Sequence, residues 1–182
     1  MSEETIIKNC SPTLAGLKTA NLFSCVYENK EELLRQVEEI RRILLKKGVD
    51  IKILRIRKST ALVYVYRPML LKKSICRGEI MDFLDKRGYK SFSEEACINT
   101  LAARLKNDEF PHEIGVFLGY PFEDILGFIK NSGGNYKLCG YWKVYGDRIS
   151  AQKTFAKFKK CTDVYCRKFK EGSTIQRLTV AV

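Results

Sequence analysis

The chain has 182 residues, of which 45% are hydrophobic and 30% are charged, and its net charge is +12. This composition is typical of a globular protein and excludes an intrinsically disordered one, and we expect residues 1–182 to form a single domain without a linker. The first residues are acidic, and no uninterrupted apolar stretch approaches the ~20 residues of a membrane span. We therefore expect a cytoplasmic protein without a signal peptide or a membrane-spanning helix.

The positive charge is concentrated in two segments of the chain. Residues 41–77 hold 12 basic and 1 acidic residue, and residues 137–170 hold 10 basic and 2 acidic residues. We call these segments the first and the second basic block. If the two blocks meet in the fold, they form a positive face that attracts anionic partners. If they do not meet, they are ordinary solvated surface.

The first half of the chain predicts two helices and three strands. Ser11 followed by Pro12 is typical of a helix start. Hydrophobic residues at helical spacing, with acidic residues leading and basic residues trailing, predict a long helix that ends at Gly48. Apolar segments on either side of Lys58 and Ser59 predict a β-hairpin. The expected elements are a helix at 12–19, a strand at 22–27, a helix at 30–47 and hairpin strands at 49–56 and 61–66.

The second half of the chain predicts mainly helices, with Gly or Pro at their ends. Ser93 is expected to cap a helix whose first turn is acidic. The expected elements are short helices or turns at 68–71 and 78–86, the helix after Ser93, a strand at 114–118, a helix at 121–131, a strand at 138–145, a basic helix at 147–170 and an edge strand at 174–182. This order predicts an α/β (α+β) fold, a single-domain sandwich in which helices pack on a mixed sheet of about five strands.

Two runs of unusual composition stand out in this half. Residues 110–124, Phe-Pro-His-Glu-Ile-Gly-Val-Phe-Leu-Gly-Tyr-Pro-Phe-Glu-Asp, contain the only histidine, and residues 139–147, Cys-Gly-Tyr-Trp-Lys-Val-Tyr-Gly-Asp, contain the only tryptophan. Together with residues 10–18, Cys-Ser-Pro-Thr-Leu-Ala-Gly-Leu-Lys, these runs resemble the domain of unknown function 3793 family of anaerobic Gram-positive bacteria. The resemblance extends over nearly the whole chain. It implies a compact cytoplasmic bacterial protein, and it brings no known activity, cofactor or catalytic residue.

The leading hypothesis from the residues is a binding or regulatory module for an anionic ligand, either a nucleotide or a nucleic acid. Cations of the two basic blocks would hold phosphates, and aromatic side chains among them would stack on bases. The candidate ligand-binding residues are His112, Glu113, Tyr141, Trp142, Lys143, Arg55, Arg57, Lys157 and Lys160. The sequence indicates no particular cofactor. It also indicates no metal site, because the seven cysteines form no Cys-x-x-Cys pair and only one histidine is present.

An alternative hypothesis is a small cysteine-dependent hydrolase or transferase, which we favour less than the binding module. Cys10 directly precedes the predicted helix start, where the helix dipole lowers the pKa of a thiol. His112 would act as the general base, oriented by Asp147, Glu113 or Asp124. The catalytic candidates of this alternative are Cys10, His112 and Asp147.

Two further interpretations concern the first of the unusual runs. The adjacent carboxylates Glu123 and Asp124 are expected in the first turn of a helix, where they stabilise its N-terminus, and an acid–base pair is the alternative. A protein-docking scaffold is the third functional hypothesis. It requires an exposed apolar patch around Phe117, Tyr120 and Phe122.

Overall fold

The structure is a computed structural model that describes residues 1–107 and 110–181. Its internal contacts separate into two compact units, of which unit 1 consists of Met1–Leu71 and Cys161–Val182 and unit 2 consists of Lys72–Lys160. The expectation of one domain over the whole chain stays a prediction. None of the helices in the described ranges is long and apolar enough to cross a membrane.

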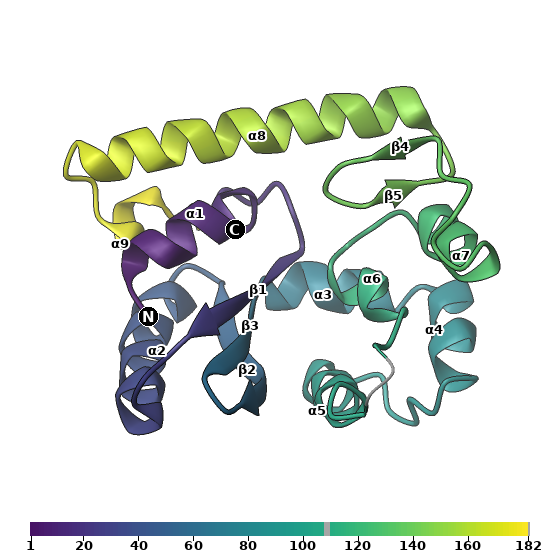
Figure 1. Ribbon diagram of the computed structural model, residues 1–182, viewed down its shortest axis with the longest axis horizontal. Coiled ribbons are helices and arrows are strands. Elements are labelled where there is room, and N and C mark those ends of the chain that lie inside the picture. Colours follow the sequence, from purple (N-terminus) through teal and green to yellow (C-terminus); the bar gives the residue numbers. More distant parts are fainter. Residues whose placement is uncertain (108–109, 182) are drawn as a thin grey trace. The chain divides into compact units, whose positions relative to one another are not determined.

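Unit 1 combines helices with a three-stranded antiparallel sheet. Its elements are α1 (Glu3–Leu14), β1 (Ala20–Val26), α2 (Lys30–Leu45), β2 (Asp50–Arg57), β3 (Thr60–Tyr66), the start of α3 (Pro68–Ile75), the end of α8 (Arg148–Lys170) and α9 (Ile175–Leu178). The strand order is β1-β3-β2, and β2 and β3 form the predicted hairpin. Helices α1 and α2 pack against the sheet, and α9 contacts α1 (Figure 1). The predicted strand at 22–27 and the predicted helix at 30–47 are confirmed.

The central strand β3 is buried on both faces. Ala61, Val63 and Val65 on one face pack in a core with apolar side chains of α1, α2, β1, β2 and α9. The other face presents Tyr64 and Tyr66, whose fully buried rings stack with their centroids 4.9 Å apart. A strand that is buried on both faces has a continuous apolar sequence, and residues 61–66 have such a sequence.

Unit 2 is mainly helical. Its elements are the end of α3, α4 (Gly78–Asp85), α5 (Glu94–Arg104), α6 (Ile114–Phe117), α7 (Phe122–Lys130), β4 (Leu138–Cys139), β5 (Lys143–Val144) and the start of α8. The predicted helices at 78–86 and 121–131 are confirmed, as is the helix capped by Ser93, whose hydroxyl accepts from the backbone N–H of Ala96 at 3.3 Å. The predicted basic helix at 147–170 is confirmed as α8.

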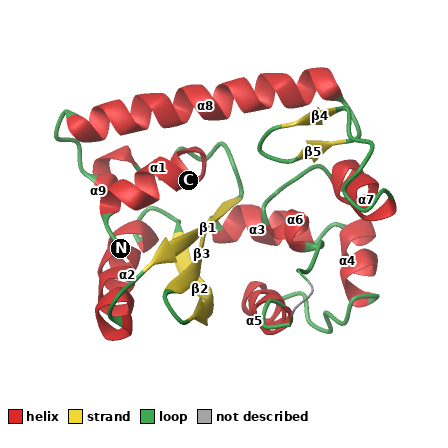
Figure 2. Ribbon diagram, viewed as in Figure 1, coloured by secondary structure: helices red, strands yellow, loops and turns green. Residues whose placement is uncertain are grey.

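The fold class is α+β, and Figure 2 shows how its helices and strands are distributed. The described residues form nine helices, one three-stranded antiparallel sheet and one two-stranded hairpin. The expected mixed sheet of about five strands is therefore wrong. Three segments that were expected to be strands account for the difference.

The predicted strand at 114–118 is wrong, because these residues form the helical turn α6. The backbone N–H of Val116 donates to Glu113 O at 2.9 Å, and that of Leu118 donates to Ile114 O at 3.0 Å. All five residues of this segment are buried. A short apolar run fits a buried strand and a buried helical turn equally well. Here the backbone satisfies its hydrogen bonds locally, so it needs no partner strand.

The backbone groups of the other two segments also form their hydrogen bonds with nearby residues. Residues 138–145 do not form one strand but fold back on themselves, and Gly140 N–H donates to Trp142 O at 3.1 Å in the turn between β4 and β5. The expected edge strand at 174–182 is wrong for residues 174–181, and residue 182 lies outside the described residues. Thr174 caps the short helix α9 by accepting a hydrogen bond from the N–H of Arg177 at 3.3 Å.

The predicted helix at 12–19 is also wrong. Helix α1 begins at Glu3, and Ser2 caps it by accepting from the N–H of Thr5 at 3.2 Å. Pro12 lies in the last turn of this helix and not in its first turn. A proline near the end of a helix removes one internal hydrogen bond, which this helix tolerates close to its natural end.

Candidate functional site

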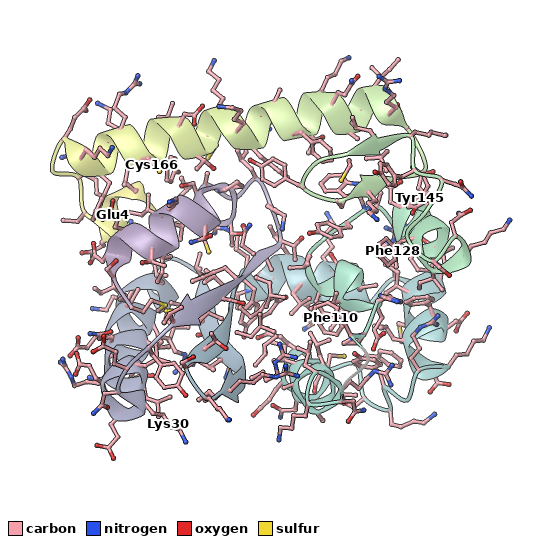
Figure 3. The ribbon with its side chains drawn as sticks, viewed as in Figure 1. Glu4, Lys30, Phe110, Phe128, Tyr145 and Cys166 are labelled. Carbon is pink, nitrogen blue, oxygen red and sulfur yellow. The ribbon has the colours of Figure 1, made fainter. Side chains whose placement is uncertain are left out.

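A cavity of about 280 Å³ in unit 2 is lined by residues from both unusual runs and from α7. We call it the aromatic cavity because five aromatic rings line it, among them Phe110 and Phe128, which Figure 3 labels. The rings belong to Phe110, His112, Tyr120, Phe128 and Trp142. Pockets that bind small molecules are typically apolar and aromatic with a few polar groups, and this cavity has that character.

The buried carboxylate of Asp124 holds the hairpin β4–β5 against the first turn of α7. Its Oδ2 accepts from the indole Nε1 of Trp142 at 2.7 Å, and its Oδ1 accepts from the backbone N–H groups of Tyr145 at 2.7 Å and Gly146 at 2.8 Å. Asp124 is only 3% exposed. The neighbouring Glu123 is exposed. The predicted helix-start position of both carboxylates is confirmed, and Asp124 additionally positions the tryptophan.

Ring contacts arrange the walls of the aromatic cavity. Tyr120 stacks on Trp142 with centroids 5.1 Å apart, and its hydroxyl donates to Tyr141 O at 3.1 Å. Burial raises the pKa of Tyr120 to about 12, so this hydroxyl remains a donor at neutral pH. His112 also lines the cavity and meets Phe128 edge-on with centroids 5.0 Å apart. Flat aromatic surfaces of this kind favour contact with a flat apolar group.

Gly140 allows the hairpin to approach α8 closely. A Cβ atom at this position would lie 2.4 Å from the ring of Phe155, whose ring in turn meets Trp142 edge-on at 4.6 Å. Any larger residue at position 140 would push this ring away from the hairpin. The glycine therefore contributes to the placement of the tryptophan.

A second cavity, of about 350 Å³, shares Phe110 and His112 with the aromatic cavity. Its polar lining includes Arg87, Arg104 and Glu113, and we call it the arginine cavity. A cavity with a polar lining therefore adjoins a cavity with an apolar lining, and His112 borders both.

The charges of the arginine cavity are held by defined partners. The buried carboxylate of Glu113 accepts from Arg104 Nε and from the hydroxyl of Tyr89, the latter at 3.1 Å. Burial raises the pKa of Tyr89, which keeps its hydroxyl a donor. Arg87 lies over the ring of Phe83, with its guanidinium carbon 3.6 Å from the ring centroid. Because Glu113 offsets Arg104, the charge of Arg87 remains uncompensated among these groups.

The structure brings together several of the residues that the sequence singled out. His112, Trp142 and Lys143 line the aromatic cavity, and Glu113 lines the arginine cavity. Lys143 also donates to Gly133 O at 2.7 Å. These four positions come from the two unusual runs.

The remaining ligand-binding candidates lie elsewhere. Tyr141 packs against Phe155 and Phe158 of α8, with centroids 5.6 and 5.3 Å apart. Lys157 and Lys160 are exposed on α8, and Arg55 and Arg57 lie on β2 of unit 1. That the two basic blocks form one positive face stays a prediction.

Several lining residues were missed by sequence reasoning. Phe128 lies four residues after Asp124, on the same face of α7, and this helical spacing could have identified it. Arg87 and Arg104 follow or end two other helices, α4 and α5. No local pattern links these arginines to the unusual runs.

The environment of Cys10 contradicts the basis of the cysteine-enzyme hypothesis. Cys10 is fully buried inside α1 and is not at a helix start, and burial raises the pKa of its thiol. Burial also lowers the pKa of the nearby Lys18 to about 7. Both shifts favour the uncharged forms, so the thiol is not activated as a thiolate. Cys10 belongs to unit 1, and His112 and Asp147 belong to unit 2.

Asp147 acts as the cap of α8. Its Oδ1 accepts from the N–H groups of Ile149 at 2.9 Å and Ser150 at 3.0 Å, which accounts for its position just before the helix.

The patch required for a docking scaffold is also absent in its expected form. Phe117 is fully buried, and Tyr120 and Phe122 are half-buried.

We expect Cys10 to resist alkylation in the folded protein. Exposed Cys76 and Cys139 should react with iodoacetamide at neutral pH more than about 100-fold faster than Cys10, because the buried thiol is both protonated and inaccessible. Mass spectrometry of time points identifies the modified cysteines, and the same reaction in denaturant is the control. Equal rates at Cys10 and Cys139 in the native protein would contradict this assignment.

Among the residues that the structure describes, no group of three or more His, Cys, Asp and Glu side chains is placed to hold a metal ion.

A family model described as a protein of unknown function, DUF3793, matches residues 6–179 of the chain. This match confirms the resemblance carried by the three motifs. Searches of curated proteins and of solved structures find no match.

Proposed function

We propose, for a chain that belongs to the DUF3793 family of proteins of unknown function, that unit 2 is a binding module for a small anionic ligand that carries a planar apolar group. The observation that carries this proposal is that two cavities of different chemistry share Phe110 and His112. The planar group occupies the aromatic cavity, and the anionic group reaches the arginine cavity past His112.

The size and lining of the aromatic cavity indicate the apolar part of the ligand. A 150 Å³ apolar cavity in a protein accepts one benzene molecule, so a cavity of about 280 Å³ suits one or two fused rings. Its two most polar side chains are already engaged, since Asp124 holds the hairpin and Lys143 binds Gly133 O. The planar group is therefore recognised by ring contacts and shape and not by a set of hydrogen bonds.

The arginine cavity supplies the attraction for a carboxylate or a phosphate. A guanidinium group offers several N–H donors in a flat fork that matches these anions. The ring of Phe83 supports the guanidinium of Arg87, whose Nη1 donates to Phe83 O at 3.0 Å. This support holds the side chain in place before a ligand arrives, which lowers the entropic cost of binding. A nucleotide has the same arrangement of ring and anion and is one member of this ligand class.

The fluorescence of Trp142 tests this proposal, because it is the only tryptophan and lines the aromatic cavity. We expect 4-phenylbutyrate to change its emission in a saturable titration, and 4-phenylbutan-1-ol, which has the same apolar body without the charge, to bind more weakly. In the variant Arg87→Gln, binding of 4-phenylbutyrate should weaken about tenfold, the loss expected for one charge-assisted hydrogen bond. Binding of the alcohol should remain within about twofold.

The matched control is Lys130→Gln, which removes an exposed positive charge from α7 outside both cavities. It should leave both titrations unchanged. Adenosine monophosphate, titrated in parallel, distinguishes a nucleotide site from a site for a simpler acid. The proposal fails if no probe changes the emission, or if Arg87→Gln weakens the alcohol as much as the carboxylate.

A further inference from the structure

One exposed face of α8 carries a row of lysines on the side of the helix opposite its buried residues. Ala151 and Phe158 are buried, and Lys153, Lys157 and Lys160 are exposed at the spacing i, i+4 and i+7. Seven residues of helix rise by about 10 Å, so the row is short and straight. Within the described part of the chain, no ion pair involves these three lysines. Their charges are thus available to an external partner.

An aromatic depression lies beside this lysine row. It is lined by Gly140, Tyr141, Phe155, Ala156 and Lys159. Tyr141 is 38% exposed, although its ring also packs on Phe155. Ala156 lies three residues after Lys153 and four before Lys160, so the depression and the row are neighbours on the helix surface. Ala156 is itself exposed and has a small side chain.

We propose that this face of α8 binds single-stranded nucleic acid, with successive phosphates on Lys153, Lys157 and Lys160 and one base on Tyr141. Proteins that bind single strands without sequence preference combine a row of cations along the backbone with aromatic rings on which bases stack. Both components are present here within residues 140–160 of unit 2. Gly140 borders both this depression and the aromatic cavity, but Lys153, Lys157 and Lys160 line neither of the two cavities around His112. The proposal therefore does not depend on the small-ligand function.

The character of the exposed face favours a nucleic acid over a membrane surface. A helix that binds a membrane presents large apolar residues that enter the lipid, next to its cations. On α8 the row of lysines faces solvent, and the strongly exposed large apolar residue, Ile149 at 65%, lies in the first turn and not within the row. The aromatic residues of α8 near the row, Phe155 and Phe158, pack on Tyr141.

Fluorescence anisotropy with a labelled eight-residue oligothymidylate tests this inference on the full chain. Three phosphate contacts predict a slope of about −2 for the logarithm of the binding constant against the logarithm of salt concentration. The triple variant Lys153→Gln, Lys157→Gln and Lys160→Gln should lose this salt dependence together with most of the affinity. An abasic oligomer of the same length should bind about tenfold more weakly, because it lacks the stacked base.

The charge-matched control is the triple variant Lys8→Gln, Lys30→Gln and Lys46→Gln, which removes three exposed lysines of unit 1. It should bind the oligomer with the affinity and salt slope of the wild type. Arg87→Gln should also bind it normally, which separates this surface from the arginine cavity. Equal loss in both triple variants would overturn the lysine assignment. Equal binding of the abasic oligomer would overturn the base site and reduce the surface to a general polyanion site.

Discussion

The variant Asp124→Asn should lose about 3 kcal/mol of unfolding free energy and shift the emission of Trp142. The amide oxygen of the asparagine can still accept from the N–H groups of Tyr145 and Gly146. Its NH₂ group then faces the indole N–H, so two donors meet in a half-buried site where one charge-assisted hydrogen bond was lost. For a chain of this length the change corresponds to a drop of roughly 9 °C in the melting temperature. Thermal unfolding and the tryptophan spectrum measure the two effects.

Glu123→Gln is the matched control for Asp124→Asn. It makes the same chemical change at the adjacent position in the first turn of α7, but its side chain is exposed, so the expected loss is under about 0.5 kcal/mol. A double-mutant cycle of Asp124→Asn with Trp142→Phe should show a coupling energy of at least about 1 kcal/mol. Additive effects would mean that the carboxylate does not hold the indole. Equal losses at positions 123 and 124 would contradict the assigned role of Asp124.

The elements that could be predicted from the sequence are those whose signals are local. The cap at Ser93 and the hairpin around Lys58 depend on residues within a few positions of each other, and the structure confirms both. The run at 114–118 shows where this reasoning stops. Five buried apolar residues in a row indicate burial but do not distinguish a strand from a turn of helix, because the choice depends on whether a partner strand is present.

The candidate site likewise contains some residues that the sequence could identify and others that it could not. His112 and Trp142 attract attention as the only residues of their type, and the structure places both on the aromatic cavity. The buried partners of Glu113 could not be predicted, since Arg104 and Tyr89 come from different segments whose approach is set by tertiary packing. The sequence pattern that suggested an active Cys10 failed for a related reason. The true helix start at Glu3 lies nine residues before Pro12, where the Ser-Pro pair places it, so the thiol lies inside the helix instead of at its N-terminus.

In unit 1, the variant Arg67→Met should lose about 3 kcal/mol of unfolding free energy and loosen the C-terminal segment. The buried guanidinium of Arg67 donates to Thr13 O at 2.7 Å, Leu14 O at 2.7 Å and Val180 O at 2.8 Å. It thereby joins the end of α1 to the residues that follow α9. Methionine fills a similar volume but leaves three carbonyl groups without this donor and removes a positive charge from the C-terminal end of a helix. Hydrogen exchange of the amides at 175–180 should accelerate more than that of β3.

Arg67→Lys separates the charge of this residue from its geometry. A lysine keeps the positive charge, but its single ammonium group cannot reproduce a flat fork that reaches three carbonyls on two segments, so about half of the stability should be lost. The control is Arg42→Met, which removes an arginine whose side chain is 74% exposed and pairs with Glu38, where the expected loss is under about 0.5 kcal/mol. If the lysine variant matches the wild type in both stability and exchange, charge alone would hold the segment. If Arg67→Met exchanges at 175–180 as slowly as the wild type, the C-terminal segment is held by the packing of Ile175 and not by the guanidinium.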